Sequence, residues 1–227
     1  GIAILIRFVQ IPFEQLIDQW KNILVFMSLA SMILGAVAAI GQTNIKRLIA
    51  YSSIGHIGYA LAGISTGTPA GYSSSITYIS IYVIMNLGVF GCIFLMKKDG
   101  KYCEDINHLA GISKQNPLLA ISFLIIMFSL AGIPPLAGFF AKLYVFISVI
   151  ESGMYMLAIV GLLSTVISAF YYLRIIKIIY FDEIKNPFDK IKNLGITSTV
   201  FLSCTILVLF FLYPSILNNI VKILSIS

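Results

Sequence analysis

Long apolar runs separated by short polar segments dominate this chain. Six such runs occur, at about residues 23–41, 45–65, 73–96, 117–150, 154–180 and 194–213. A transmembrane helix needs about 20 consecutive apolar residues, and every run except 117–150 has a length near that value. The pattern predicts an all-α integral membrane protein with about six full transmembrane helices.

The fourth run is too long for one straight helix, and it contains the pair Pro134-Pro135. Proline lacks an N–H and its ring clashes with the preceding turn, so two in succession break a helix. We therefore expect one span built from two half-helices, over about 117–132 and 136–150.

The first apolar stretch, residues 1–8, is too short to cross a membrane. We expect it to be the end of a helix that begins elsewhere, so that a partial N-terminal helix precedes the six full ones. No low-complexity linker divides residues 1–227, which we interpret as a single membrane domain, and no strand pattern is convincing.

The charges between the runs predict an orientation. Alternate loops are basic and contain Lys46, Arg47, Lys97, Lys98, Lys101, Lys114, Lys185, Lys190 and Lys192, whereas the other loops contain few positive charges. Loops rich in lysine and arginine stay on the cytoplasmic or matrix side of a membrane. The strict alternation supports the count of six spans.

Composition narrows the class of protein further. Hydrophobic residues make up 59% of the chain and charged residues 11%, with a mean hydropathy of +0.98. These values exclude a soluble domain, and topology accounts for the net charge of +6 without a nucleic-acid partner. The three cysteines have no paired spacing, and no glycine-rich phosphate loop is present. We expect no nucleotide, flavin or redox metal in this chain.

Lys142 is the residue least suited to lipid. A lysine near the centre of a transmembrane helix costs about 2.5–3.5 kcal/mol. The proline break beside it also exposes backbone groups, which membranes tolerate only where protein or a water-filled cavity satisfies them. Broken helices recur at the ion sites of transporters, and a buried lysine can take up and release a proton near neutral pH. We interpret Lys142 as a proton carrier; the alternative is a lysine that reaches the membrane surface or pairs structurally.

His56 is the second candidate for proton transfer. Ser52, His56 and Tyr59 lie four and three residues apart, so they share one face of the second span. Histidine titrates near neutral pH through two distinct ring nitrogens. The alternative is a histidine that joins two helices by a hydrogen bond.

Two further polar stripes have four-residue spacing. Tyr78, Tyr82 and Asn86 lie in the third span, where Tyr82 and Asn86 are candidates to hold water on a proton path or to bond neighbouring helices. A stripe in the fifth span consists of Ser164, Ser168 and Tyr172, which we interpret as helix packing. The spans contain no Asp or Glu, so a carboxylate partner for Lys142 must come from elsewhere, which indicates a second polypeptide.

Two long motifs carry a family resemblance. QTNIKRLIAYSSIGHIGYAL (42–61) and SLAGIPPLAGFFAKLYVF (129–146), followed by AFYYLRIIKIIY (169–180), are similar to the C-terminal half of NADH dehydrogenase subunit 2. That family is an antiporter-like membrane subunit of respiratory complex I. The resemblance covers essentially the whole chain.

The resemblance implies roles for individual residues. The broken helix at Pro134-Pro135 matches a discontinuous helix of the family, and Lys142 and His56 match residues of a hydrophilic axis that carries protons. The family's glutamate and other lysines have no counterpart here, which implies a separate chain with the N-terminal half. FMN, iron–sulfur clusters and ubiquinone would be bound elsewhere in the complex, and other membrane-arm subunits and lipids would be the partners.

Two other functions remain open at this point. One is the large subunit of a multisubunit cation/proton antiporter, which shares this fold. The other is a structural membrane scaffold, in which Lys142 would be held permanently in a salt bridge. We expect the mitochondrial inner membrane, with the bacterial plasma membrane as the alternative.

Overall fold

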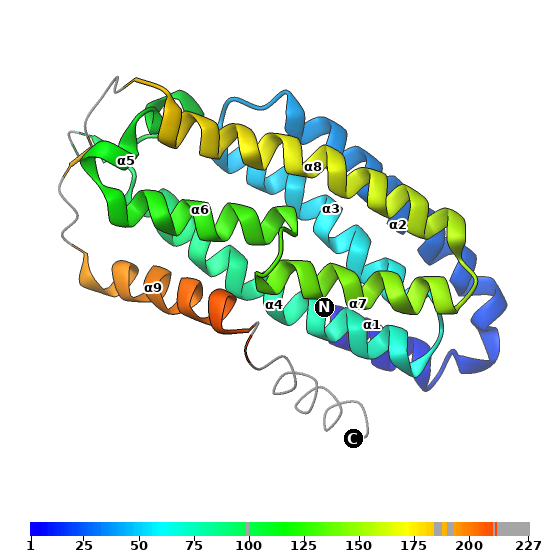
Figure 1. Ribbon diagram of the computed structural model, residues 1–227. Coiled ribbons are helices and arrows are strands. Elements are labelled where there is room, and N and C mark those ends of the chain that lie inside the picture. The colour runs from blue at the N-terminus through cyan, green and yellow to red at the C-terminus, as the bar shows by residue number, and fades with distance from the viewer. Residues whose placement is uncertain (99, 184–187, 190–192, 211, 213–227) are drawn as a thin grey trace.

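The computed structural model describes residues 1–98, 100–183, 188–189, 193–210 and 212, and these residues are mostly helical (Figure 1). The helices are α1 (Ile2–Gln10), α2 (Ile17–Ile40), α3 (Ile45–Ser65), α4 (Pro69–Leu95), α5 (Ile112–Gln115), α6 (Pro117–Ala131), α7 (Ala137–Glu151), α8 (Tyr155–Phe181) and α9 (Leu194–Leu209). Two 3₁₀ turns occupy Glu14–Leu16 and Ile106–Leu109. Strands β1 (Lys97–Lys98) and β2 (Lys101–Tyr102) form an antiparallel hairpin.

Four helical segments are long and apolar enough to cross a membrane: Glu14–Ile40, Ile45–Ser65, Pro69–Leu95 and Tyr155–Phe181. The predicted broken span is present as α6 and α7, which follow each other end to end (Figure 1). The last predicted span corresponds to α9, an apolar helix of 16 residues. The structure thus bears out a helical membrane fold, whereas the count of six full spans stays a prediction.

Capping residues set the beginnings of four helices. The side-chain oxygen of each cap accepts a hydrogen bond from a backbone N–H of the first turn, which would otherwise have no partner. Proline occupies the first position of two of these helices, where no N–H is needed. The caps are Asn44 before α3, Thr68 before α4, Asn116 before α6 and Asn193 before α9.

Polarity is arranged inside out relative to a soluble protein. Large apolar side chains such as Phe26 and Val166 are 71% and 69% exposed, whereas Ser52, His56 and Lys142 are buried. Hydroxyl groups in the interior bond neighbouring helices; Ser28 Oγ, for example, donates to Gly58 O across 2.7 Å. This distribution fits a bundle whose outer surface faces lipid.

The two basic loops that the structure describes, at the start of α3 and between α4 and α6, lie at the same end of the bundle (Figure 1). There the segment between α4 and α6 packs against the start of α3, since Ile45 N donates to Glu104 O and Ile106 N donates to Thr43 O. Lys46 Nζ forms an ion pair of 2.7 Å with Glu104, and Asn44 Nδ2 donates to the same carboxylate.

The loop between α4 and α6 contains a short hairpin that the sequence analysis does not predict. Strands β1 and β2 contradict the expectation that the chain contains no strand, because the dipeptide Asp-Gly at 99–100 is a strong hairpin signal. Lys97 Nζ lies 4.6 Å from the centroid of the Tyr102 ring, which belongs to the second strand of this hairpin. The predicted basic residues Lys185, Lys190 and Lys192 lie outside the described residues.

Lowering the pH should loosen the segment that carries Glu104. Hydrogen bonds from Lys46 and then Asn44, with the positive charge of Lys46, hold the pKa of the Glu104 carboxyl below its ordinary value. A carboxyl whose folded-state pKa is lowered stabilises the fold above its unfolded pKa, and this contribution is lost as the pH falls through the folded value. Hydrogen exchange of the Ile45 amide, corrected for the intrinsic rate, should therefore accelerate a few-fold in acid below the ordinary carboxyl pKa.

A variant and a control sharpen this measurement. Glu104→Gln should show the faster exchange already at neutral pH and should lose the acid step. Glu151→Gln, at the far end of α7, should behave like the parent chain. An unchanged acid step in Glu104→Gln would assign the effect to another group.

Candidate functional site

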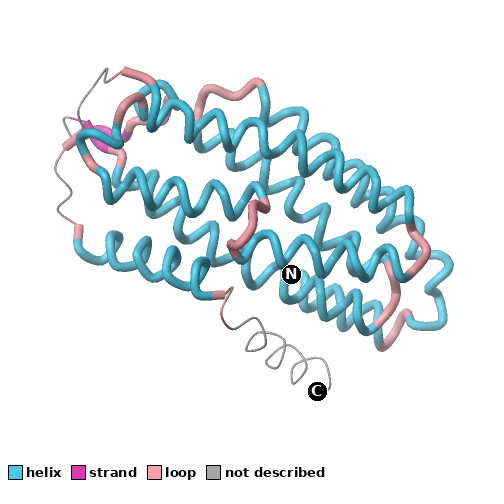
Figure 2. Tube along the Cα trace, in the orientation of Figure 1, coloured by secondary structure: helices cyan, strands magenta, loops and turns pink. Residues whose placement is uncertain are grey.

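The break predicted at the two prolines lies at residues 132–136 (Figure 2). Gly132 has a φ of 84°, in the left-handed region that ends helices without a Cβ penalty. Pro134 and Pro135 follow it, and neither can donate a backbone hydrogen bond to continue the helix. The chain resumes its helical course in α7.

The way α6 ends leaves two carbonyl groups available. The amide of the glycine that ends the helix donates to Phe128 O (3.1 Å) and Ser129 O (3.0 Å). The last four carbonyls of a helix have no helical partner, so those of Leu130 and Ala131 still need a donor. Lys142 Nζ supplies it, with bonds of 3.1 Å to Leu130 O and 3.0 Å to Ala131 O.

Lys142 is thereby held in the interior rather than at the membrane surface. Its side chain is 4% exposed, and its Nζ lies 5.2 Å from the centroid of the Tyr59 ring. An ammonium over an aromatic face is attracted by the ring quadrupole. Within the part of the chain that the structure describes, Lys142 pairs with no carboxylate. Carbonyl dipoles and an aromatic ring therefore surround this nitrogen.

His56 forms the centre of a cluster drawn from three helices. Its Nδ1 lies 2.7 Å from Tyr78 Oη on α4, and its Nε2 lies 3.1 Å from Tyr172 Oη on α8. Tyr172 Oη also bonds Ser52 Oγ, and the imidazole stacks on the Tyr82 ring at a centroid distance of 4.6 Å. A tyrosine hydroxyl can donate or accept, so the cluster can accommodate either neutral tautomer of the histidine.

Tyr59 lies between the lysine and the histidine cluster. Its ring contacts Lys142 on one side and meets the His56 ring edge-on at 6.2 Å. Its hydroxyl group bonds Thr165 Oγ1 (2.9 Å) and Ser164 Oγ (3.3 Å) on α8. Among the described residues no hydrogen bond joins Lys142 to His56 directly, so Tyr59 separates the two candidate proton carriers.

The structure thus brings together Lys142, His56, Ser52, Tyr59 and Tyr82, all named from the sequence. Asn86 is the exception, because it lines a groove with Ile196 and Thr199 of α9. On a helix, residues four apart are offset by about 40° around the axis. The direction of the side chain therefore shifts by about 80° from Tyr78 to Asn86, which is eight residues later. Asn86 has therefore rotated away from the face that Tyr78 presents to the histidine.

Two direct partners of His56 were not on the predicted list of site residues. Tyr78 shared a stripe with Tyr82, which was a usable signal. Tyr172 belonged to a stripe interpreted as packing; Ser164 fits that interpretation, since its Oγ donates to Met32 O (3.0 Å), but Tyr172 does not. The four-residue spacing shows that Ser164, Ser168 and Tyr172 share one face of their helix. It does not show which neighbouring helix this face contacts.

Comparison with known proteins places this chain in a family. The NADH:quinone oxidoreductase/Mrp antiporter transmembrane family matches residues 1–168, which include both His56 and Lys142. NADH-quinone oxidoreductase subunit N of Pelagibacter ubique is 58% identical over 222 residues, or 98% of this chain and 47% of that protein. The protein of the same name from Rhodospirillum rubrum is 48% identical over 95% of this chain and 44% of its own length. The chain spans about half the length of the curated relatives it matches.

Solved structures agree on the fold. A chain of respiratory complex I from Thermus thermophilus with bound aureothin has a TM-score of 0.75 and 29% identity, over 87% of this chain and 45% of that one. A chain of the Mrp complex from Dietzia sp. DQ12-45-1b has a TM-score of 0.88 over 99% of this chain and 50% of that one; its identity of 21% shows the fold alone. By its sequence and its fold, the chain belongs to the NADH:quinone oxidoreductase/Mrp antiporter family of transmembrane proteins.

Proposed function

We propose that this chain is part of a proton-translocating membrane-arm subunit of a respiratory NADH:quinone oxidoreductase. The observation that carries the proposal is the position of Lys142, buried at a helix break with its Nζ bonded to two backbone carbonyls. A buried ammonium without a carboxylate partner among the described residues is costly, and such groups in membranes mark ion and proton pathways.

In this proposal Lys142 alternates between its charged and neutral forms. The carbonyls of Leu130 and Ala131 and the Tyr59 ring stabilise the ammonium, and none of them is basic enough to accept the proton that it releases. His56, bonded through both ring nitrogens, relays the proton through the hydroxyl groups of Tyr78 and Tyr172. The chain performs no redox chemistry; quinone reduction elsewhere in the complex, where FMN, iron–sulfur clusters and ubiquinone would be bound, supplies the energy.

The finer assignments belong to the same proposal. We infer that the chain corresponds to the C-terminal half of subunit 2, as one domain with six spans. The match to about half of each relative supports a half, and the motifs at 42–61 and 129–146 support the C-terminal one. Other membrane-arm subunits of the complex would be its neighbours. The relatives named above are bacterial, which favours the bacterial plasma membrane over the mitochondrial inner membrane.

The two alternative functions, an antiporter subunit and a structural scaffold, are weighed on different observations. A cation/proton antiporter subunit is compatible with the fold that the chain shares with the Mrp complex chain. The sequence identity with subunit N proteins is more than twice as high, at 58% against 21%, which favours the respiratory complex. A scaffold would hold Lys142 in a salt bridge, whereas the described residues give it two carbonyls and an aromatic ring.

Proton transport in reconstituted vesicles tests the proposal. The complex that contains this chain should move protons when NADH and a quinone are added, and an uncoupler should abolish the signal. An imposed sodium or potassium gradient without NADH should move none. Proton movement driven by the cation gradient, and not by NADH, would instead establish the antiporter.

A further inference from the structure

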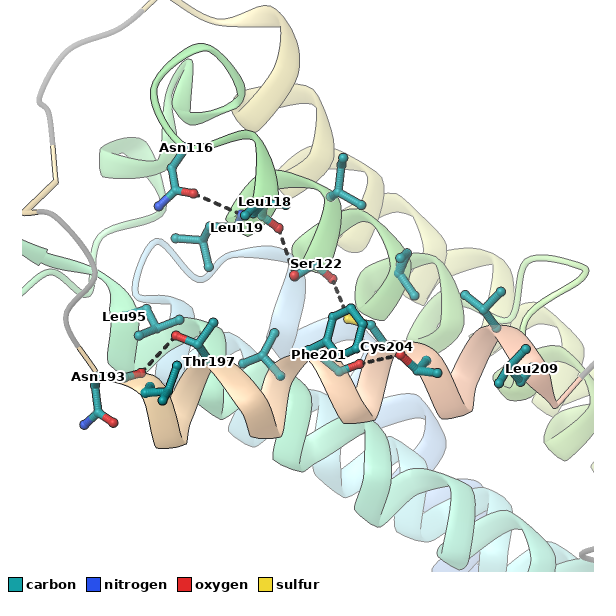
Figure 3. A pocket seen from close by; sticks show the side chains of 16 residues that line it. Leu95, Asn116, Leu118, Leu119, Ser122, Asn193, Thr197, Phe201, Cys204 and Leu209 are labelled. Atoms are coloured by element: carbon teal, nitrogen blue, oxygen red, sulfur yellow. Dashed lines mark hydrogen bonds between the residues drawn. The ribbon is translucent and has the colours of Figure 1, made fainter.

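An apolar groove of about 730 Å³ runs between α6 and α9, and its lining includes neither Lys142 nor His56. Its walls are mainly aliphatic and aromatic, and Leu118 and Phe201 are 77% and 73% exposed. Figure 3 shows Asn116 and Asn193 at one end of the groove and Leu209 at the other. An empty groove would forfeit dispersion contacts along its whole length, so an apolar occupant is favoured.

The polar end of the groove offers hydrogen-bond donors. Asn116 Oδ1 accepts from Leu119 N and Asn193 Oδ1 accepts from Ile196 N, so each amide oxygen is used as a helix cap. Within the described ranges their NH2 groups donate to no protein acceptor. Asn116 before α6 and Asn193 at the start of α9 thus mark the polar end of the groove, one on each of its two helices.

The charge at this end is positive. Lys114 is exposed and lies two residues before Asn116. The two carboxylates of this loop that the structure describes are both engaged: Glu104 bonds Lys46 and Asp105 Oδ1 accepts from Asn107 N. Lys114 thus supplies a positive charge that is close in sequence to the Asn116 end of the groove.

The dimensions suit one lipid chain. The 16 residues of α9 extend about 24 Å at 1.5 Å per residue. An acyl chain of one leaflet covers about half of the ~30 Å hydrocarbon core, so it would end inside the groove. We propose that the groove binds an anionic phospholipid, with an acyl chain between α6 and α9 and its phosphate at Lys114, Asn116 and Asn193. This site is independent of the proton path proposed above.

Photolabelling in the assembled complex tests this site. The complex is reconstituted in phosphatidylcholine vesicles that contain a small fraction of phosphatidylglycerol with a diazirine on its acyl chain. After illumination, mass spectrometry compares labelling of residues 118–125 and 197–209 with labelling around Val166 on the outer face of α8. A second series uses phosphatidylcholine with the same diazirine. The ratio of groove to α8 labelling should be about fivefold higher for phosphatidylglycerol, since a lysine at an anionic membrane surface contributes about 1 kcal/mol.

A matched pair of variants identifies the headgroup contact. Lys114→Gln should return the ratio to the phosphatidylcholine value, whereas Lys101→Gln, on β2 of the same loop, should leave it unchanged. Equal ratios for the two lipids would mean that bulk lipid fills the groove and would overturn the proposal. Labelling near Val166 without labelling of the groove would also overturn it, because a neighbouring protein would then cover the site.

Discussion

Replacing Lys142 with Met should lower the number of protons moved per NADH oxidised, because a positioned proton-transfer group speeds the step that it serves by about 10²–10⁴-fold. The complex should still assemble. The buried lysine costs about 2.5–3.5 kcal/mol, while leaving two carbonyls unpaired costs about 1–3 kcal/mol each, so the two effects largely offset. The measurement combines a pH-sensitive dye in vesicles, the rate of NADH oxidation and the subunit content of the purified complex.

Lys21→Met is the matched control, because Lys21 lies in the first turns of α2 and outside the site. It should leave both the proton yield and assembly unchanged. A normal proton yield in Lys142→Met would remove the central element of the proposed function, whatever the geometry around the residue.

Hydropathy predicts where the helices lie along the chain, but it does not always predict the residue at which a helix begins. The predicted run 45–65 coincides with α3, whose cap is polar and whose body is apolar. In contrast, α4 begins four residues before the predicted 73, because Thr68 caps it and Pro69 occupies its first position. Backbone hydrogen bonding sets where a helix starts, whereas hydropathy reports only the part that lipid or the core requires to be apolar.

The candidate site shows the same division. Lys142 and His56 could be found because a charged or titratable group within an apolar run is expensive and therefore informative. Tyr172 could not be assigned to His56, since it lies 116 residues further along the chain and the contact depends on how α8 packs against α3. Which carbonyls Lys142 bonds was equally hidden, because the backbone conformation at Gly132 decides which of them remain free.

Gly138→Ala should destabilise the chain by about 3 kcal/mol or more, the upper part of the range for overpacking. A Cβ at this position would lie 1.8 Å from Ser129 O and 2.6 Å from Ser129 C, and backbone atoms cannot rotate aside as a side chain can. The close approach is also bonded, since Gly138 N donates to Ser129 Oγ across 3.1 Å. The start of α7 would have to move away from the end of α6 and would carry Lys142 away from its carbonyls. The melting temperature of the complex and the number of protons that it moves per NADH oxidised should both fall.

Gly41→Ala separates this steric effect from a general effect of losing a glycine. Gly41 follows α2 at a φ of −78°, and an added Cβ there would meet nothing within 4 Å. Helix propensity favours alanine over glycine by up to about 1 kcal/mol, so a loss of stability in Gly138→Ala cannot come from propensity. If both variants melt like the parent, α6 and α7 tolerate separation at their junction. That result would contradict the idea that Gly138 holds Lys142 in place against Leu130 O and Ala131 O.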